Sequence, residues 1–593
     1  MGDTGGMGGM AEGSTLLGAL PVDVRQAVVA RLEPRSLHGG ETLVEQGDEA
    51  DGLYLVHAGR LQATMRTGDG DTVLGEIGRG EVVGEAALLT EQRRTATIVA
   101  LRDTELWHLP LAAFDELVAE HPSFLRPIAA QVVQRMLTAG SRQVASQPVT
   151  TVAIVPMHGT ELASDATAAL ADALAAVVGR GLVVDSGDRP DDRSDAGWIQ
   201  SLEVDNDLVV FRCDADADDD ADDATRRFLR QADAVVLVAD AAQGPAVTPC
   251  ESLLAEHRER VDVPVELVLV HPATCVEARG TRRWLDGRRL RRHHHVRAGD
   301  EAHAARVARL VTDRGIGVVL SGGGARSMAE IGVIAAMVEL GIPIDAVGGT
   351  SAGALVAGAF ARGWSVQEVR DVLHQGMVAQ GSPIDPTVPF TSLAAGRRMT
   401  ERLQAAAGEV DIEDLWLPFY CVSTNLSRNR PEIHRRGRGW RAVRASMSIP
   451  GIFPPVAEGG DVLVDGGLVD NLPVAEMRRA HEGITVVAVD VGVHRGMNAG
   501  DLPDSTVVHG WRLLRDRIHP GRRSPKIAGI IAILTRLTEL GGGSVATDLG
   551  DVLVRPDVDR FPMLDFSRFD DLIAVGEREG RSALSDWWRS REP

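Results

Sequence analysis

The sequence predicts an α/β protein of three domains, the first of them rich in β-strands. The chain has 593 residues, which is more than one hydrophobic core usually serves. Short apolar runs between glycine turns fill the N-terminal part, and buried strands alternate with helical segments in the rest. We expect a flexible, glycine-rich tail followed by three domains, with these boundaries: 1–13, 14–140, 150–300 and 312–590.

The N-terminal domain is expected to be a small antiparallel barrel or β-roll. Runs of strand-forming residues at 53–56, 61–65 and 72–74 are separated by glycine turns. Residues 111–140 then become helical, because apolar side chains recur three and four positions apart.

The middle segment predicts a parallel sheet. Four apolar runs, at 152–155, 208–211, 234–238 and 265–270, alternate with helical stretches, which is typical of an α/β layer fold. From Gly315 onward the same alternation returns and continues almost to the end of the chain.

Two charged stretches of the middle segment imitate metal sites. The stretch 214–225 begins like an EF-hand loop, but Asp219 stands where the turn needs glycine and Thr225 where a glutamate ligand is needed. We expect a solvated acidic loop there. The basic run 282–297 holds three adjacent histidines, at 293–295, which cannot converge on one metal from a regular element. We expect a charged connector and no metal site.

The composition excludes several classes of function. Apolar residues make up 44% of the chain and charged residues 25%, as in ordinary soluble globular proteins. Lys and Arg number 62 against 84 Asp and Glu, and the resulting formal charge of −22 argues against nucleic acid as a partner. Lys526 is the only lysine, which excludes a Walker A loop, because that loop needs a lysine to reach the phosphates.

The cysteines and the N-terminus favour a cytoplasmic protein. No two cysteines form a CxxC pair, so neither a zinc site nor a disulfide framework is indicated. Residues 1–13 lack the basic and apolar regions of a signal peptide, and no stretch approaches the ~20 apolar residues that span a bilayer. We expect any contact with a membrane to be peripheral. The cysteines are Cys213, Cys250, Cys275 and Cys421.

A candidate nucleophile follows an apolar strand at 344–347. The sequence there is Gly349-Thr350-Ser351-Ala352-Gly353, and a helix is expected to follow it. Small residues flank the serine because a nucleophile on a sharp strand-to-helix turn holds a strained backbone with no room for bulk. Such a turn exposes the hydroxyl near a helix N-terminus, whose amides favour developing negative charge.

Two further motifs support a hydrolytic site. Ser321-Gly322-Gly323-Gly324-Ala325-Arg326 joins a strand to a helix, and consecutive glycine amides there can bind an oxyanion. A phosphate-binding turn is the alternative interpretation. Asp465 ends another strand and is followed by two glycines, where its carboxylate can take the serine proton without a histidine.

Together these motifs resemble the patatin-like phospholipase family. The phrases at 441–455 (RAVRASMSIPGIFPP) and 465–473 (DGGLVDNLP) are similar to its neuropathy target esterase branch. The resemblance implies a three-layer α/β/α domain over 312–590. By the same resemblance Ser351 is the nucleophile, Asp465 is the base, and no cofactor is required. The implied oxyanion hole consists of the amides of Gly323, Gly324 and Ala325.

The resemblance implies hydrolysis of lysophospholipid or phospholipid acyl esters through an acyl-enzyme. This chain departs from the family at Ser327, where glycine is usual, and at Glu330, where histidine is frequent. Ser327 could narrow the turn near the leaving group, and Glu330 could alter the preferred substrate charge. The middle segment also resembles the linker region of the same branch, at 228–234 and 293–297.

Other interpretations of the C-terminal domain are a silent hydrolase fold within a nucleotide-responsive scaffold, and an α/β-hydrolase with a catalytic histidine. The second lacks an HGGG motif before the serine. The apolar segment 527–540 predicts a helix for core packing, with interfacial membrane contact as the alternative. The histidines available to an α/β-hydrolase are His481, His494, His509 and His519.

The N-terminal domain carries a cassette that resembles the phosphate-binding cassette of cyclic-nucleotide-binding domains. Its amides could meet the cyclic phosphate, its glutamate the ribose hydroxyl, and its arginine the phosphate charge. The resemblance implies cAMP or cGMP as a regulatory ligand, with a docking domain as the alternative. Arg93 stands where the family has proline, and Gly47 and Gly59 match its turn glycines. The candidate contact residues are Gly84, Glu85, Ala86, Ala87, Arg94 and Thr95.

Overall fold

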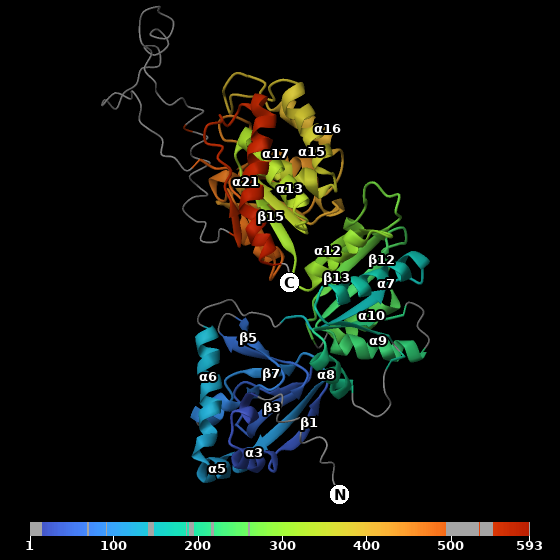
Figure 1. The fold of residues 1–593 in the computed structure, drawn as a ribbon, viewed down its shortest axis with the longest axis vertical. Helices are drawn as coiled ribbons and strands as arrows, with labels where there is room; N and C mark the ends of the chain where they lie inside the picture. Colours follow the sequence, from blue (N-terminus) through green and yellow to red (C-terminus); the bar gives the residue numbers. More distant parts are fainter. Residues whose placement is uncertain are drawn as a thin grey trace, which may run out of the picture. The chain divides into compact units, whose positions relative to one another are not determined.

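The computed structural model describes residues 15–67, 70–90, 92–139, 148–185, 187–188, 195–214, 219–258, 261–493, 533 and 550–591 (Figure 1). The chain divides into two compact units. The first contains residues 1–274 and 287–312, and the second contains residues 275–286 and 313–593. The predicted tail at 1–13 and nearly all of the apolar segment 527–540 lie outside the described residues.

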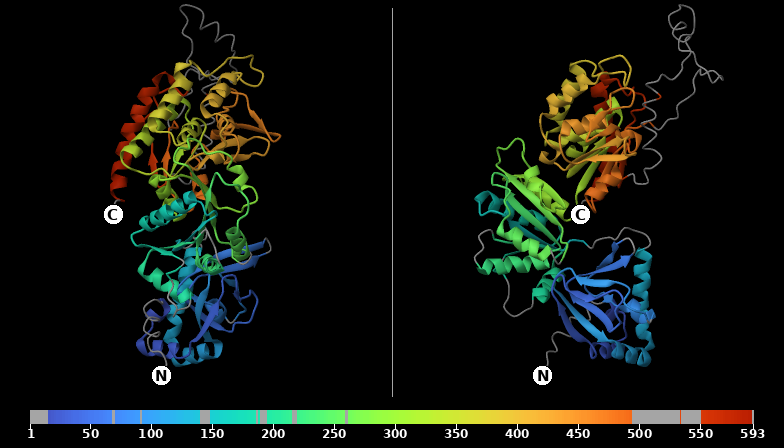
Figure 2. Two further views of the ribbon diagram at one scale, coloured as in Figure 1. Left: turned by 90° about the vertical axis from the view of Figure 1, so that its right-hand side faces the viewer. Right: turned by 180° about the vertical axis from the view of Figure 1, so that it is seen from behind.

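The N-terminal domain is built from two four-stranded antiparallel sheets. Their strand orders are β1-β8-β3-β6 and β2-β7-β4-β5. Helix α6 runs along one side of the strands (Figure 1 and Figure 2). The strands are β1 Glu33–Leu37, β2 Thr42–Val44, β3 Gly52–Ala58, β4 Leu61–Thr67, β5 Gly70–Ile77, β6 Val82–Val83, β7 Thr97–Ala100 and β8 Thr104–Pro110. The helices are α2 Thr15–Gly18, α3 Val22–Val29, α4 Glu85–Thr90, α5 Leu111–Glu120, η1 Pro122–Phe124 and α6 Leu125–Ala139.

The middle domain is a six-stranded parallel sheet with strand order β10-β11-β9-β12-β13-β14. Helices cover both of its faces, since neighbouring residues of a strand point in opposite directions. Val210 packs in one apolar cluster with Leu170 of α7, whereas Phe211 stacks on Phe228 of α9. The strands are β9 Thr151–Pro156, β10 Gly181–Asp185, β11 Leu208–Arg212, β12 Ala234–Asp240, β13 Val265–His271 and β14 Arg292–Arg297. The helices are α7 Glu161–Ala176, α8 Asp195–Asp205, α9 Asp219–Gln231, α10 Pro249–Arg258 and α12 Glu301–Val311.

Two predictions for the middle domain were wrong. The expected acidic loop at 214–225 becomes helix α9 from Asp219 onward, while residues 215–218 lie outside the described part. The expected charged connector ends in β14, the edge strand of the sheet. Its charges are neutralised inside the protein, because Glu266 of β13 accepts hydrogen bonds from Arg292 at 2.8 Å and lies 2.6 Å from Nε2 of His294.

The C-terminal domain is an eight-stranded mixed sheet. The order is β19-β20-β17-β16-β15-β21-β22, and β18 pairs with β17 beside this path. The strands are β15 Ile316–Leu320, β16 Ala346–Thr350, β17 Phe419–Asn425, β18 Arg430–His434, β19 Val456–Glu458, β20 Asp461–Asp465, β21 Thr485–Val489 and β22 Val552–Val554. The helices are η2 Gly324–Ser327, α13 Met328–Glu339, α14 Ala352–Ala361, α15 Val366–His374, η3 Gln375–Ala379, α16 Arg397–Ala407, η4 Ile412–Asp414, α17 Gly439–Ser446, η5 Gly466–Leu468, α18 Val474–Ala480, η6 Phe566–Arg568 and α21 Phe569–Arg589.

Helices cover both faces of this sheet as well. A Cβ atom at Gly317 would meet Met477 of α18, at 2.8 Å from its sulfur. The next residue, Val318, packs on the other face in a cluster that includes Met337 of α13 and Val356 of α14. The predicted three-layer arrangement and the α/β fold class are therefore confirmed.

Glycines bring α21 directly against α13. A Cβ atom at Gly576 would lie 1.8 Å from the carbonyl oxygen of Ala329, and one at Gly332 would lie 2.0 Å from that of Ile573. The two helices run side by side (Figure 1 and Figure 2). Because α13 directly follows the glycine-rich loop, this contact fixes the helix that carries that loop.

Residues 275–286 leave the strand order of the middle domain and pack within the second unit. Nε1 of Trp416 donates to the carbonyl oxygen of Val276 at 3.0 Å, and the buried amide of Thr281 donates to Asp414 at 2.9 Å. Glu277 forms an ion pair with Arg362 at the C-terminal end of α14. The segment contains helix α11, Arg282–Leu285. The second unit is therefore discontinuous in sequence.

Candidate active site

Ser351 stands on a strained turn between β16 and α14. Its φ of 54° and ψ of −125° lie in a region that side-chain-bearing residues rarely adopt. The flanking glycines make this turn sterically possible. A Cβ atom at Gly349 would lie 2.7 Å from the carbonyl oxygen of Leu320, and one at Gly353 would lie 2.5 Å from that of Ser321. The turn thus presses against the end of β15, as a nucleophile elbow does.

The hydroxyl of Ser351 donates a hydrogen bond to the carboxylate of Asp465. Oγ lies 2.7 Å from Oδ2, and the two side chains approach from residues that are 114 positions apart in the sequence. Both residues are buried. Burial raises the pKa of Asp465 to about 6, although hydrogen bonds from Ser351 and Gly467 act in the opposite direction. The carboxylate is thus a stronger base than an exposed aspartate and is still ionised at neutral pH.

Asp465 is fixed on every side. Its second oxygen, Oδ1, accepts from the amide of Gly467 at 2.9 Å, and its own amide donates to the carbonyl oxygen of Ser448 at 2.9 Å. Its carbonyl oxygen accepts from Thr424 at 2.8 Å. A Cβ atom at Gly466 would lie 2.2 Å from the carbonyl oxygen of Val422, so only glycine fits directly after the aspartate.

Ser446, at the end of α17, holds the backbone of Ser351, the candidate nucleophile. Its Oγ accepts from the amide of Ser351 at 2.8 Å and donates to the carbonyl oxygen of Val422 at 2.5 Å. The serine hydroxyl therefore links the strained turn to β17, and all three groups are buried. Such a bond fixes the backbone on which the reactive hydroxyl is mounted.

The glycine-rich loop lies against the nucleophile. A Cβ atom at Gly322 would lie 3.0 Å from Cβ of Ser351. Asn471 holds this residue, because its carbonyl oxygen accepts from the amide of Gly322 at 3.2 Å and its Nδ2 donates to the carbonyl oxygen of Gly322 at 3.1 Å.

The three predicted oxyanion donors differ in their surroundings. Within the described residues no acceptor is found for the amides of Gly323 and Gly324. The amide of Ala325, in contrast, donates to the carbonyl oxygen of Met563 at 2.7 Å. Ala325 could therefore serve an oxyanion only by giving up this bond.

Ser327 and Glu330, the two departures from the family pattern, are both fully buried. Oγ of Ser327 donates to the carbonyl oxygen of Ser321 at 3.2 Å, so it braces the start of the loop. Burial, together with the nearby carboxylate of Asp490, raises the pKa of Glu330 well above its usual value. Glu330 lies inside the protein, and its carboxyl group stays neutral over a wider pH range than an exposed glutamate.

Of the four histidines of the α/β-hydrolase interpretation, the structure describes His481, and His481 does not occupy the position of the base. His481 caps the end of α18, where its amide donates to Met477 at 2.9 Å. His494, His509 and His519 lie outside the described residues. In the described part of the chain, the side chain bonded to Ser351 Oγ is that of Asp465.

In the nucleotide cassette, Arg94 is turned into the domain. Its buried guanidinium forms an ion pair with Asp51, and it donates to the carbonyl oxygens of Gly52 at 2.9 Å and Gly84 at 3.2 Å. Glu85 is buried at the first position of α4, whereas Thr95 is exposed. Ala87 is buried in α4, and Ala86 is partly exposed beside it. A phosphate would have to share Arg94 with Asp51.

Three residues around the site were not predicted as functional: Ser446, Asn471 and Met563. Ser446 and Asn471 fall within the two phrases that carry the family resemblance, so the resemblance was the available signal for them. Met563 acts through a backbone carbonyl, which any residue type supplies, and no sequence signal marks it.

Family models match all three domains. A model of the patatin-like phospholipases matches residues 318–478. The chain contains a patatin-like phospholipase domain. A model of cyclic nucleotide-binding domains matches residues 34–121, and a model of the P-loop-like domain of the neuropathy target esterase family matches residues 149–315. The resemblance predicted from the sequence is confirmed.

Curated relatives match along almost the whole chain. Lysophospholipase NTE1 of Yarrowia lipolytica is 31% identical over 93% of this chain and 45% of its own length. Patatin-like phospholipase domain-containing protein 6 of Pongo abelii is 30% identical over 93% of this chain and 45% of its own length. The chain thus spans less than half the length of these relatives. Among solved structures, the catabolite activator protein of Thermus thermophilus is 26% identical over 28% of this chain and 73% of that chain, with a TM-score of 0.21.

The P-loop-like match agrees with the parallel sheet of the middle domain but not with a nucleotide-binding loop. The turn after β9 contains His158, Gly159 and Thr160, and Thr160 caps helix α7. The lysine that would contact phosphates is absent, as the single lysine at position 526 already required.

Proposed function

We propose that this protein is a serine esterase that hydrolyses the acyl ester of a lysophospholipid or phospholipid. The observation that carries the proposal is the 2.7 Å hydrogen bond from Ser351 Oγ to Asp465 Oδ2 in a buried site next to the glycine-rich loop. The name of the Yarrowia lipolytica relative, a lysophospholipase, supports the substrate class.

The proposed reaction has two halves. Asp465 takes the proton of Ser351 as Oγ attacks the acyl carbonyl, and the amides of Gly323 and Gly324 stabilise the oxyanion. The proton passes from Asp465 to the departing glycerol oxygen, which leaves an acyl-enzyme. Water then attacks the acyl group, gives a proton to Asp465, and releases the fatty acid while Ser351 regains its proton. Ala325 joins the oxyanion hole if Met563 releases its amide.

The site needs no metal or organic cofactor for this chemistry, since the base and the oxyanion donors all belong to the chain. We propose further that the N-terminal domain binds cAMP or cGMP at Glu85 and Arg94 and regulates the esterase. A cytoplasmic protein that meets membranes peripherally fits this proposal. Within the described residues, no helix is long and apolar enough to cross a bilayer.

The test compares wild type with Ser351→Ala and Asp465→Asn on a lysophosphatidylcholine, with fatty acid release as the measurement. We expect both variants to lose roughly a thousandfold or more in kcat, as happens when a catalytic nucleophile or base is removed. A serine-reactive phosphonate should label wild type and leave Ser351→Ala unlabelled. Ser582→Ala and Asp586→Asn, exposed positions on α21, are the matched controls. Equal fatty acid release by all variants would refute the dyad.

A further inference from the structure

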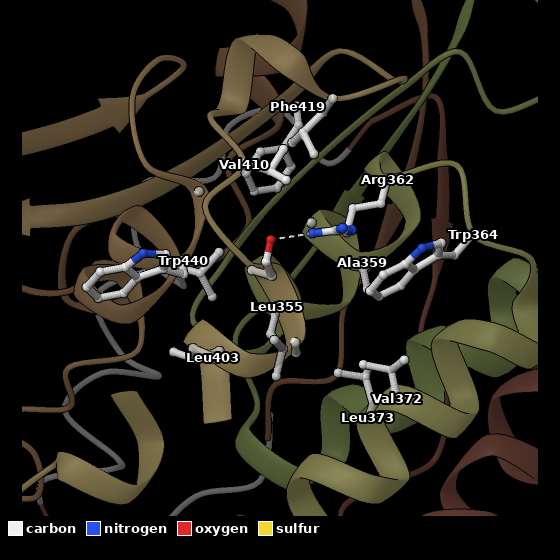
Figure 3. Close-up of a pocket in the computed structure, with 16 residues that line it drawn as sticks. Leu355, Ala359, Arg362, Trp364, Val372, Leu373, Leu403, Val410, Phe419 and Trp440 are labelled. Carbon is white, nitrogen blue, oxygen red and sulfur yellow. Dashed lines mark hydrogen bonds between the residues drawn. The ribbon is translucent and has the colours of Figure 1, made fainter. Parts of the chain in front are cut away.

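An apolar pocket lies at the end of α14 that is farther from the nucleophile. Its cavity volume is about 60 Å³, room for roughly four or five water-sized groups and so for a short hydrocarbon segment. Helices α14, α15, α16 and α17 and the first residue of β17, Phe419, form its walls. Trp440 and Trp364 lie on opposite sides of it (Figure 3).

One wall leads along α14 to the nucleophile. Leu355, Gly358, Ala359 and Arg362 line the pocket, and this spacing of three and four residues marks one face of a helix. The same face, continued one turn back, arrives at Ser351. The amide of Leu355 donates to the carbonyl oxygen of Ser351 at 3.3 Å, so the two residues are consecutive on this face. Figure 3 shows Leu355, Ala359 and Arg362 around the pocket.

A second wall leads along α17 to the same point. Gly439, Trp440 and Val443 line the pocket, and three residues after Val443 comes Ser446, whose Oγ holds the amide of Ser351. The pocket-facing sides of two helices therefore converge on the nucleophile from one direction.

The lining selects an apolar occupant. Arg362 is the charged residue among those that line the pocket, and its guanidinium is engaged by Glu277 and by the carbonyl oxygen of Ala407. Leu403, Leu373 and Val443 supply aliphatic surface, and small residues at 358 and 359 leave the space open. Nε1 of Trp440 has no hydrogen-bond partner among the described residues, but a single neutral N–H cannot balance the charge of a phosphate or choline head group, whereas a hydrocarbon chain would gain by leaving water.

The dimensions fit an acyl chain held at Ser351. With a helix rise of 1.5 Å per residue, the path along α14 from Ser351 to Arg362 is about 16 Å, roughly the length of a dozen methylene groups. Among the lining residues of α14, Leu355 is nearest in sequence to Ser351, and its side chain is inclined toward the N-terminal end of the helix.

We infer that the pocket between α14, α16 and α17 holds the distal half of the substrate's acyl chain and selects long chains over short ones. The inference rests on the proposed esterase function. An acyl chain bonded to Oγ of Ser351 runs between α14 and α17, passes Leu355, and ends beside Gly358 and Phe419. Contacts at the bottom of the pocket, far from the reacting atoms, then determine which acyl chain lengths are preferred.

The test places larger side chains at the bottom of the pocket. A Cβ atom at Gly358 would be in ordinary contact with Phe419 at 3.5 Å, so the backbone tolerates a side chain there and a leucine would project into the space. Wild type, Gly358→Leu and Ala359→Leu are compared on hexanoyl and palmitoyl lysophosphatidylcholine. Gly376→Leu is the matched control, because a Cβ atom at Gly376 meets nothing within 4 Å.

We expect the palmitoyl-to-hexanoyl ratio of kcat/KM to fall by about tenfold or more in both pocket variants, since methylene groups lose their apolar contacts. The ratio in Gly376→Leu should equal that of wild type. Labelling by a small serine-reactive phosphonate at the wild-type rate shows that the variants are folded with an intact dyad. If one of the two pocket variants fails to fold, the ratio measured for the other tests the inference.

The possible failures are distinguishable. A wild type that cleaves both esters, with pocket variants that are labelled normally and keep its ratio, would overturn the pocket and leave the dyad standing. A wild type that is neither labelled nor able to cleave either ester would overturn the proposed function and this inference with it.

Discussion

The proposed dyad of Ser351 and Asp465 and the proposed nucleotide cassette each hold an aspartate against a hydrogen-bond donor, but the pKa values of the two aspartates are shifted in opposite directions. The partner of Asp465 is a neutral hydroxyl, and burial raises its pKa to about 6. The partner of Asp51 is the cation Arg94. Burial alone would raise the pKa of Asp51, yet hydrogen bonds from Tyr54 and Arg94 and the charge of Arg94 outweigh it and lower that pKa.

Because of this difference, the pair of Ser351 and Asp465 can exchange a proton, whereas the pair of Arg94 and Asp51 stabilises a local structure. A carboxylate with a raised pKa accepts a proton at little cost, which is what a general base requires. A carboxylate held by a guanidinium resists protonation and instead orients the cation. The comparison therefore supports chemistry at Ser351 and recognition at Arg94.

The largest effect is expected from loosening the dyad without touching its reacting atoms. In Ser446→Ala the amide of Ser351 loses its acceptor, so the strained turn can relax and the hydroxyl is misplaced. We predict a loss of about a hundredfold in kcat with little change in KM, because substrate binding does not use Ser446. Steady-state kinetics and the rate of phosphonate labelling measure this.

A conservative variant provides the control. Ser446→Thr keeps an Oγ and should restore most of the rate lost in Ser446→Ala. A Ser446→Ala enzyme with the wild-type kcat would show that the bond from Ser446 to the amide of Ser351 does not position the reacting hydroxyl.

The second largest effect is expected at the nucleotide cassette, as a loss of nucleotide affinity. We predict that Arg94→Gln weakens cAMP or cGMP binding by about tenfold or more, because a charge-assisted hydrogen bond to the cyclic phosphate is lost. Isothermal titration calorimetry measures the affinity. Arg93→Gln is the matched control, since Arg93 is exposed and donates to the carbonyl oxygen of Gly47. No heat with either nucleotide in wild type would leave Arg94 and Asp51 as a purely structural pair.

The third effect is a pH dependence carried by Asp465. Its raised pKa, about 6, means that the base is mostly protonated at pH 5 and mostly ionised at pH 7. We predict that kcat/KM rises about tenfold between these two pH values, as the ionised base forms. An acid limb centred near pH 4 would show that Asp465 is as exposed to water as an ordinary aspartate.

Stability should change in the opposite direction over the same range. The pKa of Asp465 is higher in the folded protein than in the unfolded chain, so its contribution to stability is present below pH 4 and is lost as the pH rises through about 6. Asp470, whose pKa burial also raises to about 6, adds to this trend. Thermal unfolding of Asp465→Asn against wild type isolates the share of Asp465.

Most of the candidate site could be predicted from the sequence because its residues belong to short local motifs. At the glycines around Ser351 and after Asp465, a Cβ atom would clash with neighbouring backbone atoms. Only glycine fits at such positions, so the requirement is visible in the sequence. The domain order was predictable for a similar reason, since buried parallel strands need uninterrupted apolar runs.

The failures have equally physical causes. Strand β14 contains Arg292, three histidines and Arg297, a composition typical of solvent-exposed loops. Its burial is possible because Glu266 and His271 on the neighbouring strand β13 pair with its side chains. Helix α9 begins among aspartates that have low helix propensity but suit the first turn of a helix. The bond between Ala325 and Met563 joins residues from distant parts of the chain through backbone atoms, which no side-chain pattern records.

The segment 275–286 gives the molecule an unusual boundary. The polypeptide enters the second unit at Cys275, returns to the first at Gly287, and leaves it again after Thr312. A fragment that starts at residue 313 would strip Glu277 from Arg362 and Val276 from Trp416, at the rim of the pocket beside α14. The smallest fragment that keeps these partners starts at Cys275 and carries β14 and α12 with it. A domain exchange that keeps both units intact therefore has to rejoin the chain at three places, after residues 274, 286 and 312.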